Sequence, residues 1–265
     1  MKLKTVKKRK INYKDYVRRR ASVDDCLNEI TEPCKVFDQE GNLVCIYGML
    51  NADTTDLVEE LKNVNYHTST RTGGLVTTSR IFGFQPRLER RQRSFCNQTS
   101  LCKEHPTTEG ILRNLASKIS DQYLTNAPDI YENHKEMFSE VLEEWKIQGS
   151  LFTSGIINKN NPLSYHFDSG NFDKVLSCML VLRKDMEGGW LCVPEIDTKF
   201  LLKHNSLFMF DGQSLLHGVT PMSEASEDAY RFSIVYYSLK GMWKCLTLTE
   251  ELLRSRKIEL EKLKK

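Results

Sequence analysis

The apolar positions divide this chain into a helical half and a strand-rich half. Between residues 107 and 148 the apolar residues recur at helical spacing, which predicts helices over 107–124 and 131–148. From 151 onward the pattern changes to short apolar or alternating runs, which predict strands at 151–157, 163–167, 175–183, 190–193, 206–210, 215–219 and 230–238. Helices followed by closely spaced strands indicate an α+β or mostly β protein, in which a sandwich or jelly roll of about residues 150–240 is flanked by helices.

The remaining segments complete this organisation. Two short strands are expected around a turn at residues 40–42, a helix at 54–63, and a mostly irregular segment at 66–106. An amphipathic helix at about 249–265 ends the sequence. Neither an internal repeat nor a flexible linker is evident, so we predict a single domain over residues 21–265 that follows an N-terminal arm over residues 1–20.

Composition narrows the class of protein. Hydrophobic residues make up 40% of the 265 residues and charged residues 28%, which is typical of a globular protein. No apolar run is long enough for a membrane span or a secretory signal, so we expect an intracellular protein without a membrane partner. The eight cysteines are expected as free thiols. Only Cys96, Cys102 and His105 lie close enough to suggest zinc, and their spacing fits no common zinc finger.

Positive charge is concentrated in the arm of residues 1–20. This arm holds ten Lys or Arg and one Asp, a balance of +9 in a chain whose net charge is +3. Such an arm can follow a phosphate backbone or serve as a nuclear address, and it can equally be a solvated, disordered tail. A second basic cluster, Arg87, Arg90, Arg91 and Arg93, lies in a predicted loop. Two separate basic segments favour a polyanionic partner.

The stretch "LSYHFDSGN" suggests a metal site. On a strand, residues two apart project from the same face, so His166 and Asp168 would present an imidazole and a carboxylate together. His217, in "LLHGVTP", is placed where another strand could bring it beside them. Two histidines and one carboxylate on one face of a metal form the facial triad of non-haem iron(II) oxygenases. By itself His-x-Asp arises often by chance, and a lone histidine is commonly structural.

A second constellation, "YRFSIVYYS", strengthens the metal hypothesis. Arg231 and Ser233 also lie two apart in a strongly β-prone run, so both would point inward. An inward arginine is costly unless it meets an anion, and its planar fork suits a carboxylate. The chain therefore offers a metal triad followed by a carboxylate anchor.

With these motifs in place, the sequence resembles the iron(II)/2-oxoglutarate-dependent dioxygenases. The residues that carry the resemblance are His166-x-Asp168, "EGGWLCVP", His217 in "HGVTP" and Arg231-x-Ser233. Within that superfamily it is similar to the branch of the TET 5-methylcytosine dioxygenases and the J-binding-protein thymine hydroxylases, including phage and microbial relatives. "GGLVTTSRIFGFQPR", "HFDSGN" and "RFSIVYYS" carry this closer likeness, which spans about residues 66–245.

The resemblance implies a fold, a reaction and a set of roles. The fold would be a double-stranded β-helix (jelly roll) supported by helices at about 107–148. His166, Asp168 and His217 would bind Fe(II), and Arg231 with Ser233 would bind the distal carboxylate of 2-oxoglutarate. With O2, such an enzyme would hydroxylate the methyl group of a 5-methylpyrimidine in DNA and release succinate and CO2. The protein would be cytoplasmic in a phage or bacterium and nuclear in a eukaryote.

Substrate contacts follow less directly. Asn171 stands at the spacing of a base-contacting asparagine in the TET branch, although Ser-Gly-Asn is also good turn chemistry. The base-reading histidine that TET enzymes carry after the last iron ligand has no counterpart here, so the target could be thymine or 5-methylcytosine. A base in duplex must be flipped out, and the candidates for gripping the phosphates are Arg71, Arg80, Arg87, Arg90, Arg91 and Arg93.

Two other functions remain open at this point. The same chemistry could act on a protein side chain, a small molecule or an alkylated base, and both basic segments would then be incidental. Alternatively, a non-catalytic β-barrel module could carry the ligand spacing by chance.

Overall fold

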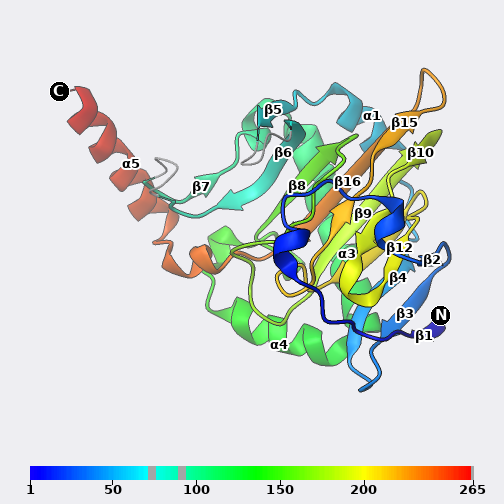
Figure 1. Ribbon diagram of the computed structural model, residues 1–265. Coiled ribbons are helices and arrows are strands. Elements are labelled where there is room, and N and C mark those ends of the chain that lie inside the picture. The colour runs from blue at the N-terminus through cyan, green and yellow to red at the C-terminus, as the bar shows by residue number, and fades with distance from the viewer. Residues whose placement is uncertain (71–75, 89–93, 264–265) are drawn as a thin grey trace. The chain divides into compact units, whose positions relative to one another are not determined.

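The computed structural model describes residues 1–70, 76–88 and 94–263, which form two compact units. The first unit comprises residues 1–80, 156–169 and 173–235, and the second comprises residues 81–155, 170–172 and 236–265. The boundaries of these residue ranges fall within β6 (Val76–Gln85), β8 (Ser154–Lys159) and β16 (Tyr230–Tyr237), which are labelled in Figure 1. Each unit is built from three separate stretches of the chain, which alternate along the sequence. This division does not decide whether residues 21–265 form a single domain, which stays a prediction.

The larger sheet of the first unit contains the long strands. Its order is β1-β3-β4-β13-β9-β16-β8-β6-β5, with β7 paired to β6 outside this path. The strand bounds, in chain order, are β1 Lys2–Thr5, β3 Cys34–Phe37, β4 Leu43–Met49, β5 His67–Thr70, β6 Val76–Gln85, β8 Ser154–Lys159, β9 Ser177–Lys184, β13 Ser206–Phe210 and β16 Tyr230–Tyr237.

A smaller sheet has the order β14-β11-β12-β2, formed by Gly218–Val219, Leu191–Val193, Thr198–Phe200 and Asn28–Ile30. Strands β10 (Met186–Gly188) and β15 (Met222–Glu224) pair separately, and helix α1 spans Thr55–Asn63. One hydrophobic cluster takes side chains from both sheets: Val181 and Phe208 from the larger, Val193 and Phe200 from the smaller. A jelly roll consists of two sheets packed around a shared core, and this is the arrangement observed. The predicted fold class is therefore confirmed.

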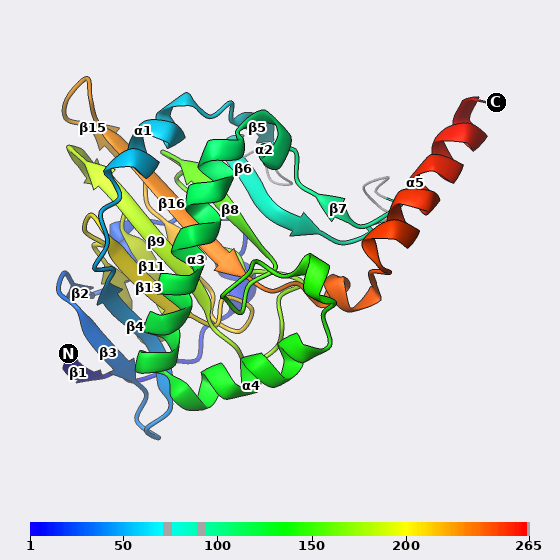
Figure 2. The same cartoon turned by 180° about the vertical axis from the view of Figure 1, so that it is seen from behind.

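The second unit is mainly helical. Helices α3 (Pro106–Asn126) and α4 (Pro128–Ser139) meet at an angle (Figure 2), and each begins with proline, which suits the first helical position because it needs no N–H there. The unit also contains β7 (Asn97–Gln98), α2 (Leu101–Glu104) and α5 (Leu248–Leu263). Tyr236, on the end of β16, is fully buried and donates a hydrogen bond to the carbonyl of Leu112 at 2.9 Å. This contact fixes α3 to residue 236 within the second unit.

Three element predictions need correction. The segment 66–106, predicted to be mostly irregular, contains β5, β6, β7 and α2. Gly83 does not mark a turn there. It lies within β6, where the absence of a side chain lets the backbone of Thr153 come close. A Cβ on Gly83 would lie 2.7 Å from the carbonyl oxygen of Thr153. The helix predicted at 131–148 ends at Ser139, because Trp145 and Ile147 are both fully buried two residues apart, which one helix face cannot achieve. The strand predicted at 163–167 is reduced to a single bridge between His166 and His217.

The N-terminal arm, for which the sequence left a disordered tail open as one alternative, is ordered over residues 1–20. Residues 2–5 pair in parallel with β3, and Val6 packs against the core shared by the two sheets. Further along, Ile11 and Tyr16 pack against a second cluster that contains Tyr165. The arm is basic, but its spaced apolar residues bury enough surface to hold it on the first unit.

The cysteines differ from the expectation of free thiols at one pair. Cys96 and Cys245 form a disulfide, with Cα atoms 5.8 Å apart, although they lie 149 residues apart in sequence. The other six are free. Among the described residues, none of the helices combines the length and apolar character needed to cross a membrane.

Candidate metal and cosubstrate site

The sequence-predicted ligands His166, Asp168 and His217 come together in the first unit. Their candidate ligating atoms all lie within 4.8 Å of one another. Nε2 of His166 is 3.7 Å from Oδ1 of Asp168, and the two imidazole rings lie 4.3 Å apart between centroids. His217 is buried, whereas the side chains of His166 and Asp168 are 28% and 26% exposed. The group is thus open on one side, as a facial triad requires.

Backbone hydrogen bonds hold the two histidines in register. The N–H of His166 donates to the carbonyl of His217 at 2.9 Å, and the N–H of His217 donates back to His166 at 3.2 Å. This closed pair joins two segments that are about fifty residues apart in the chain. The two candidate metal ligands are therefore held side by side by main-chain pairing.

Each histidine ring is oriented by a carbonyl two residues earlier. Nδ1 of His166 lies 2.8 Å from the carbonyl oxygen of Ser164, and Nδ1 of His217 lies 2.9 Å from that of Leu215. A carbonyl oxygen can only accept, so Nδ1 carries the hydrogen in both rings and Nε2 keeps a lone pair for a metal. Such partners set the tautomer and orientation of metal-binding histidines.

Asp168 is placed by a glycine. Its backbone N–H donates to the carbonyl of Gly212 at 2.8 Å, and a Cβ on Gly212 would lie 2.2 Å from Oδ2 of Asp168. The carboxylate thus occupies space that any other residue at 212 would fill. Gly212 is a site residue that sequence reasoning missed, and its only sequence signal is the Asp-Gly pair after β13.

Arg231 is buried in the same unit, 1% exposed, and points in the inward direction that its spacing predicted. Its Nε and Nη2 have no hydrogen-bond partner among the described residues. Burial, followed by the positive charge of Arg183, lowers the pKa of Arg231 to about 10. Buried donors without partners fit a site for an anion, because leaving them unpaired is costly.

Ser233 lies on the same face of β16 and is held by a chain of amides. The amide of Asn158 donates to Ser233 Oγ at 3.5 Å, and Asn161 donates to the Asn158 side-chain oxygen at 3.3 Å. Asn161 also exchanges two hydrogen bonds with the backbone of Thr78. These buried asparagines were not predicted, since asparagines between strands normally indicate turns.

The predicted substrate contacts are less complete. Asn171 lies in the second unit, where its backbone bridges Leu239. Arg87, also in that unit, pairs with buried Glu251 at 3.2 Å and donates to the carbonyl of Lys244. Roles in DNA binding for these two stay predictions. Arg71, Arg90, Arg91 and Arg93 lie outside the described residues. Arg80 is 2% exposed and donates to the carbonyl of Asn65, so burial corrects its proposed role as a phosphate grip.

A second group of possible ligands, Cys96, Cys245 and Glu251, is already engaged. The two sulfurs are bonded to each other, and Glu251 accepts from the backbone N–H groups of Cys96 and Leu246. The zinc site considered for Cys96, Cys102 and His105 loses its first ligand to this disulfide.

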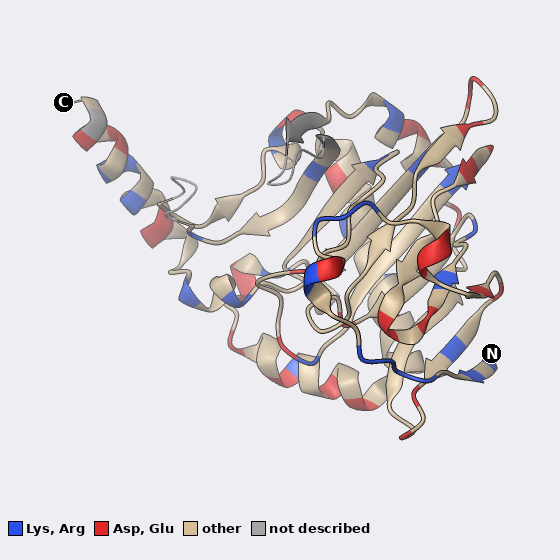
Figure 3. Cartoon of the chain, viewed as in Figure 1, with Lys and Arg blue, Asp and Glu red and all other residues tan. Residues whose placement is uncertain are grey.

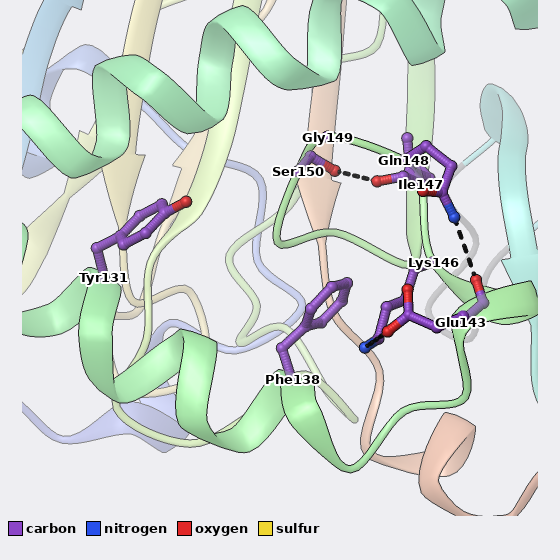
Figure 4. Close-up of a pocket in the computed structure, with 8 residues that line it drawn as sticks. All are labelled: Tyr131, Phe138, Glu143, Lys146, Ile147, Gln148, Gly149 and Ser150. Carbon is purple, nitrogen blue, oxygen red and sulfur yellow. Dashed lines mark hydrogen bonds and ion pairs between the residues drawn. The ribbon is translucent and has the colours of Figure 1, made fainter.

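A cavity of about 240 Å³ in the second unit offers little chemistry (Figure 4). Its residues run from Tyr131 to Ser150, and its polar groups are partnered locally. Lys146 pairs with Glu143 at 2.6 Å, Gln148 donates to the carbonyl of Glu143, and Ser150 donates to that of Ile147. None of the metal-site residues lines it.

Comparisons with known proteins show the family of this chain. Residues 82–240, more than half of the chain, match the Tet_JBP family, described as the oxygenase domain of the 2OGFeDO superfamily. A bifunctional helicase and thymine dioxygenase of Trypanosoma brucei brucei, JBP2, is 27% identical over 66% of this chain and 16% of its own length. JBP2 of Leishmania tarentolae is 23% identical over 91% of this chain and 22% of its own. The chain thus spans about a fifth of these relatives.

Among solved structures, NgTET1 in complex with 5mC DNA has a similar fold. Its TM-score is 0.61 at 13% identity, and the match covers 87% of each chain. At that identity the likeness concerns the fold.

Proposed function

We propose that this chain, which belongs to the Tet_JBP family of oxygenase domains in the 2OGFeDO superfamily, hydroxylates the methyl group of a 5-methylpyrimidine in DNA. The observation that carries the proposal is the group of His166, Asp168 and His217. Both histidines have Nδ1 engaged by a carbonyl, and the candidate ligand atoms of all three residues lie within 4.8 Å of one another. This donor set suits iron(II), which accepts imidazole and carboxylate ligands and needs open positions.

The residues present also fit 2-oxoglutarate. When bound, Fe(II) and 2-oxoglutarate supply the oxidising chemistry, in which O2 is consumed and succinate and CO2 are released. The chain's contribution is to hold the metal by three side chains and to bind the distal carboxylate by Arg231. The orphaned Nε and Nη2 of Arg231 and the hydroxyl of Ser233 are the donors for that carboxylate.

DNA as partner is supported by the arm of residues 1–20. Beyond β1, five of its cations are exposed and lack an ion pair within the described part of the chain: Lys7, Lys10, Lys14, Arg18 and Arg20, here called the arm cations. Figure 3 shows basic residues along this segment. The backbone of the arm is hydrogen bonded to Tyr165 on both sides, Arg18 N–H donating at 2.8 Å and Arg19 C=O accepting at 3.0 Å. Because His166 follows Tyr165, the arm cations could position phosphates close to the metal site.

The target base is thymine or 5-methylcytosine. The named sequence relatives are thymine dioxygenases, and the solved structure of similar fold holds 5mC DNA. In a duplex either base would have to be flipped out of the stack. Asn171, Arg87, Arg90, Arg91 and Arg93 remain the candidates for contacts to the base and to its phosphates.

The test is mass spectrometry of bases after incubation with Fe(II), 2-oxoglutarate and O2. We expect oxidised methylpyrimidine on single-stranded or duplex oligonucleotides that contain thymine or 5-methylcytosine, with matching release of succinate. His166→Ala, Asp168→Ala and His217→Ala should each abolish both products, because each removes a metal ligand. Asp173→Ala is the matched control, since it removes an exposed carboxylate five residues away from Asp168.

The outcomes separate the alternatives. Succinate release without any oxidised base would indicate the same chemistry on a protein side chain, a small molecule or an alkylated base. Neither product would indicate a non-catalytic module. Near-normal turnover of a ligand variant in metal-controlled buffer would remove that residue from the metal site.

A further inference from the structure

A second arginine, Arg183, points into the same interior as Arg231. On β9, Met179 and Val181 contribute to the core between the sheets, and Arg183 follows them at the same two-residue spacing. On the neighbouring strand β16, Arg231 and Ser233 share their face with Val235, which packs on the same core. Because residues two apart on a strand face the same way, both guanidinium groups are directed to one region of the barrel.

Each arginine has buried N–H donors that no described protein group accepts. Nη1 of Arg183 is buried without a hydrogen-bond partner in the described residues, as are Nε and Nη2 of Arg231. Their charges interact, since Arg183 is the one neighbouring charge that contributes to the lowered pKa of Arg231. Burial also lowers the pKa of Arg183. The like charges of the buried Arg231 and the half-buried Arg183, each with unused buried donors, oppose folding unless an anion joins them.

The segment that directly follows β9 connects Arg183 to Arg231. Nη2 of Arg183 donates to the carbonyls of Met186 and of Gly188, the latter at 3.3 Å. The next residue, Gly189, lies against Arg231, because a Cβ there would be 3.2 Å from Cδ and 3.3 Å from Nε. One end of the Arg183 fork therefore braces the Gly-Gly turn that covers Arg231. The other end, Nη1, remains available.

We infer that Arg183 is a second cation of the anion subsite, which binds the distal carboxylate of the cosubstrate together with Arg231 and makes the site selective for 2-oxo acids with a charged tail. The inference rests on the proposed function. Arg183 is a specificity-determining residue in this arrangement, since it adds a half-buried positive charge and one buried donor, Nη1, to the fork of Arg231.

Binding without turnover tests this inference. The protein is loaded with Mn(II) under anaerobic conditions, and calorimetry measures the dissociation constants of 2-oxoglutarate and of 2-oxopentanoate, in which a methyl group replaces the distal carboxylate. Arg183→Met should weaken 2-oxoglutarate by about tenfold or more and 2-oxopentanoate much less, so the selectivity ratio should fall. Arg183→Lys keeps the charge and should preserve much of the ratio. Lys184→Met is the matched control, because it removes an exposed charge on the adjacent residue.

A different result is expected if Arg183 only supports the Gly-Gly turn and does not contact the cosubstrate. Loss of the bonds to the Gly-Gly turn would weaken both acids in parallel, so an unchanged ratio in Arg183→Met would overturn the inference. Should that variant not fold, Arg183→Gln, which can still donate to the turn carbonyls, carries the same comparison. If the wild-type protein binds 2-oxoglutarate no better than 2-oxopentanoate, the assignment of Arg231 to the distal carboxylate is contradicted as well. If it binds neither, the proposed function itself is contradicted.

Discussion

Gly212 leaves open the space that the carboxylate of Asp168 occupies, and a Cβ atom at 212 would lie 2.2 Å from Oδ2. No real Cβ contact is that short. The backbones of the two residues are also joined by a hydrogen bond of 2.8 Å from Asp168 N to Gly212 O, so they cannot easily separate. The position of one proposed metal ligand is thus set by the absence of a side chain on another segment.

Gly212→Ala should therefore displace Asp168 and weaken metal binding by about 10- to 100-fold, the range seen when the support of a ligand is lost. Titration of the apo-protein with Mn(II) or Co(II) measures this. Gly110→Ala is the control, because nothing lies within 4 Å of a Cβ at that helical glycine. It should leave metal binding unchanged and stabilise the helix by up to about 1 kcal/mol. Normal metal affinity in Gly212→Ala would contradict the role given to Gly212.

Arg231→Lys keeps the positive charge but loses the forked donors that fit a carboxylate. The Michaelis constant for 2-oxoglutarate should rise more than about tenfold, or about 1.4 kcal/mol, while metal affinity survives. Steady-state kinetics at varied 2-oxoglutarate, with a parallel metal titration, checks both halves. An unchanged dependence on 2-oxoglutarate would place the anchor elsewhere.

Replacement of the arm cations by glutamine should weaken DNA binding on every sequence and leave the oxidised base the same, since phosphate contacts carry no base information. The slope of log K against log salt should flatten by about 0.9 for each lost contact on duplex. Deletion of residues 1–20 is a poorer test, because it would also remove β1 and the hydrogen bonds to Tyr165. Equal salt slopes for the two proteins would exclude the arm as a DNA contact.

His134 predicts a specific acid sensitivity. It is fully buried among aromatic rings, hydrogen bonded to Ser238 at 3.1 Å, and burial lowers its pKa to about 3. Because the folded state disfavours the proton, the stability that this neutral histidine contributes is present above pH ~6.5 and is lost as the pH falls toward 3. The loss is about 1.4 kcal/mol per pH unit within that window.

His134→Phe removes the titrating group and should flatten the decline in unfolding free energy below pH 6.5, measured by urea denaturation at several pH values. The variant also loses the bond to Ser238, so the comparison concerns the slope against pH and not the absolute stability. A slope equal to that of the wild type would show that other groups govern acid unfolding.

Local periodicity determined much of this protein from the sequence alone. Short apolar or alternating runs predicted β9, β13 and β16, and helical spacing predicted α3, near their observed bounds. The same rule placed His166 with Asp168, and Arg231 with Ser233. These inferences succeed because residues two apart on an extended backbone share a face wherever the segment packs.

Only the tertiary structure decided which distant segments meet. The Cys96–Cys245 disulfide, the pairing of the arm with Tyr165, the space that Gly212 leaves for Asp168 and the convergence of Arg183 with Arg231 all join residues far apart in the chain. Composition made the arm look disordered because its charge hides the spacing of Val6, Ile11 and Tyr16, which bury against the first unit. Burial and strand adjacency depend on the packing of the whole chain, so no local pattern could supply them.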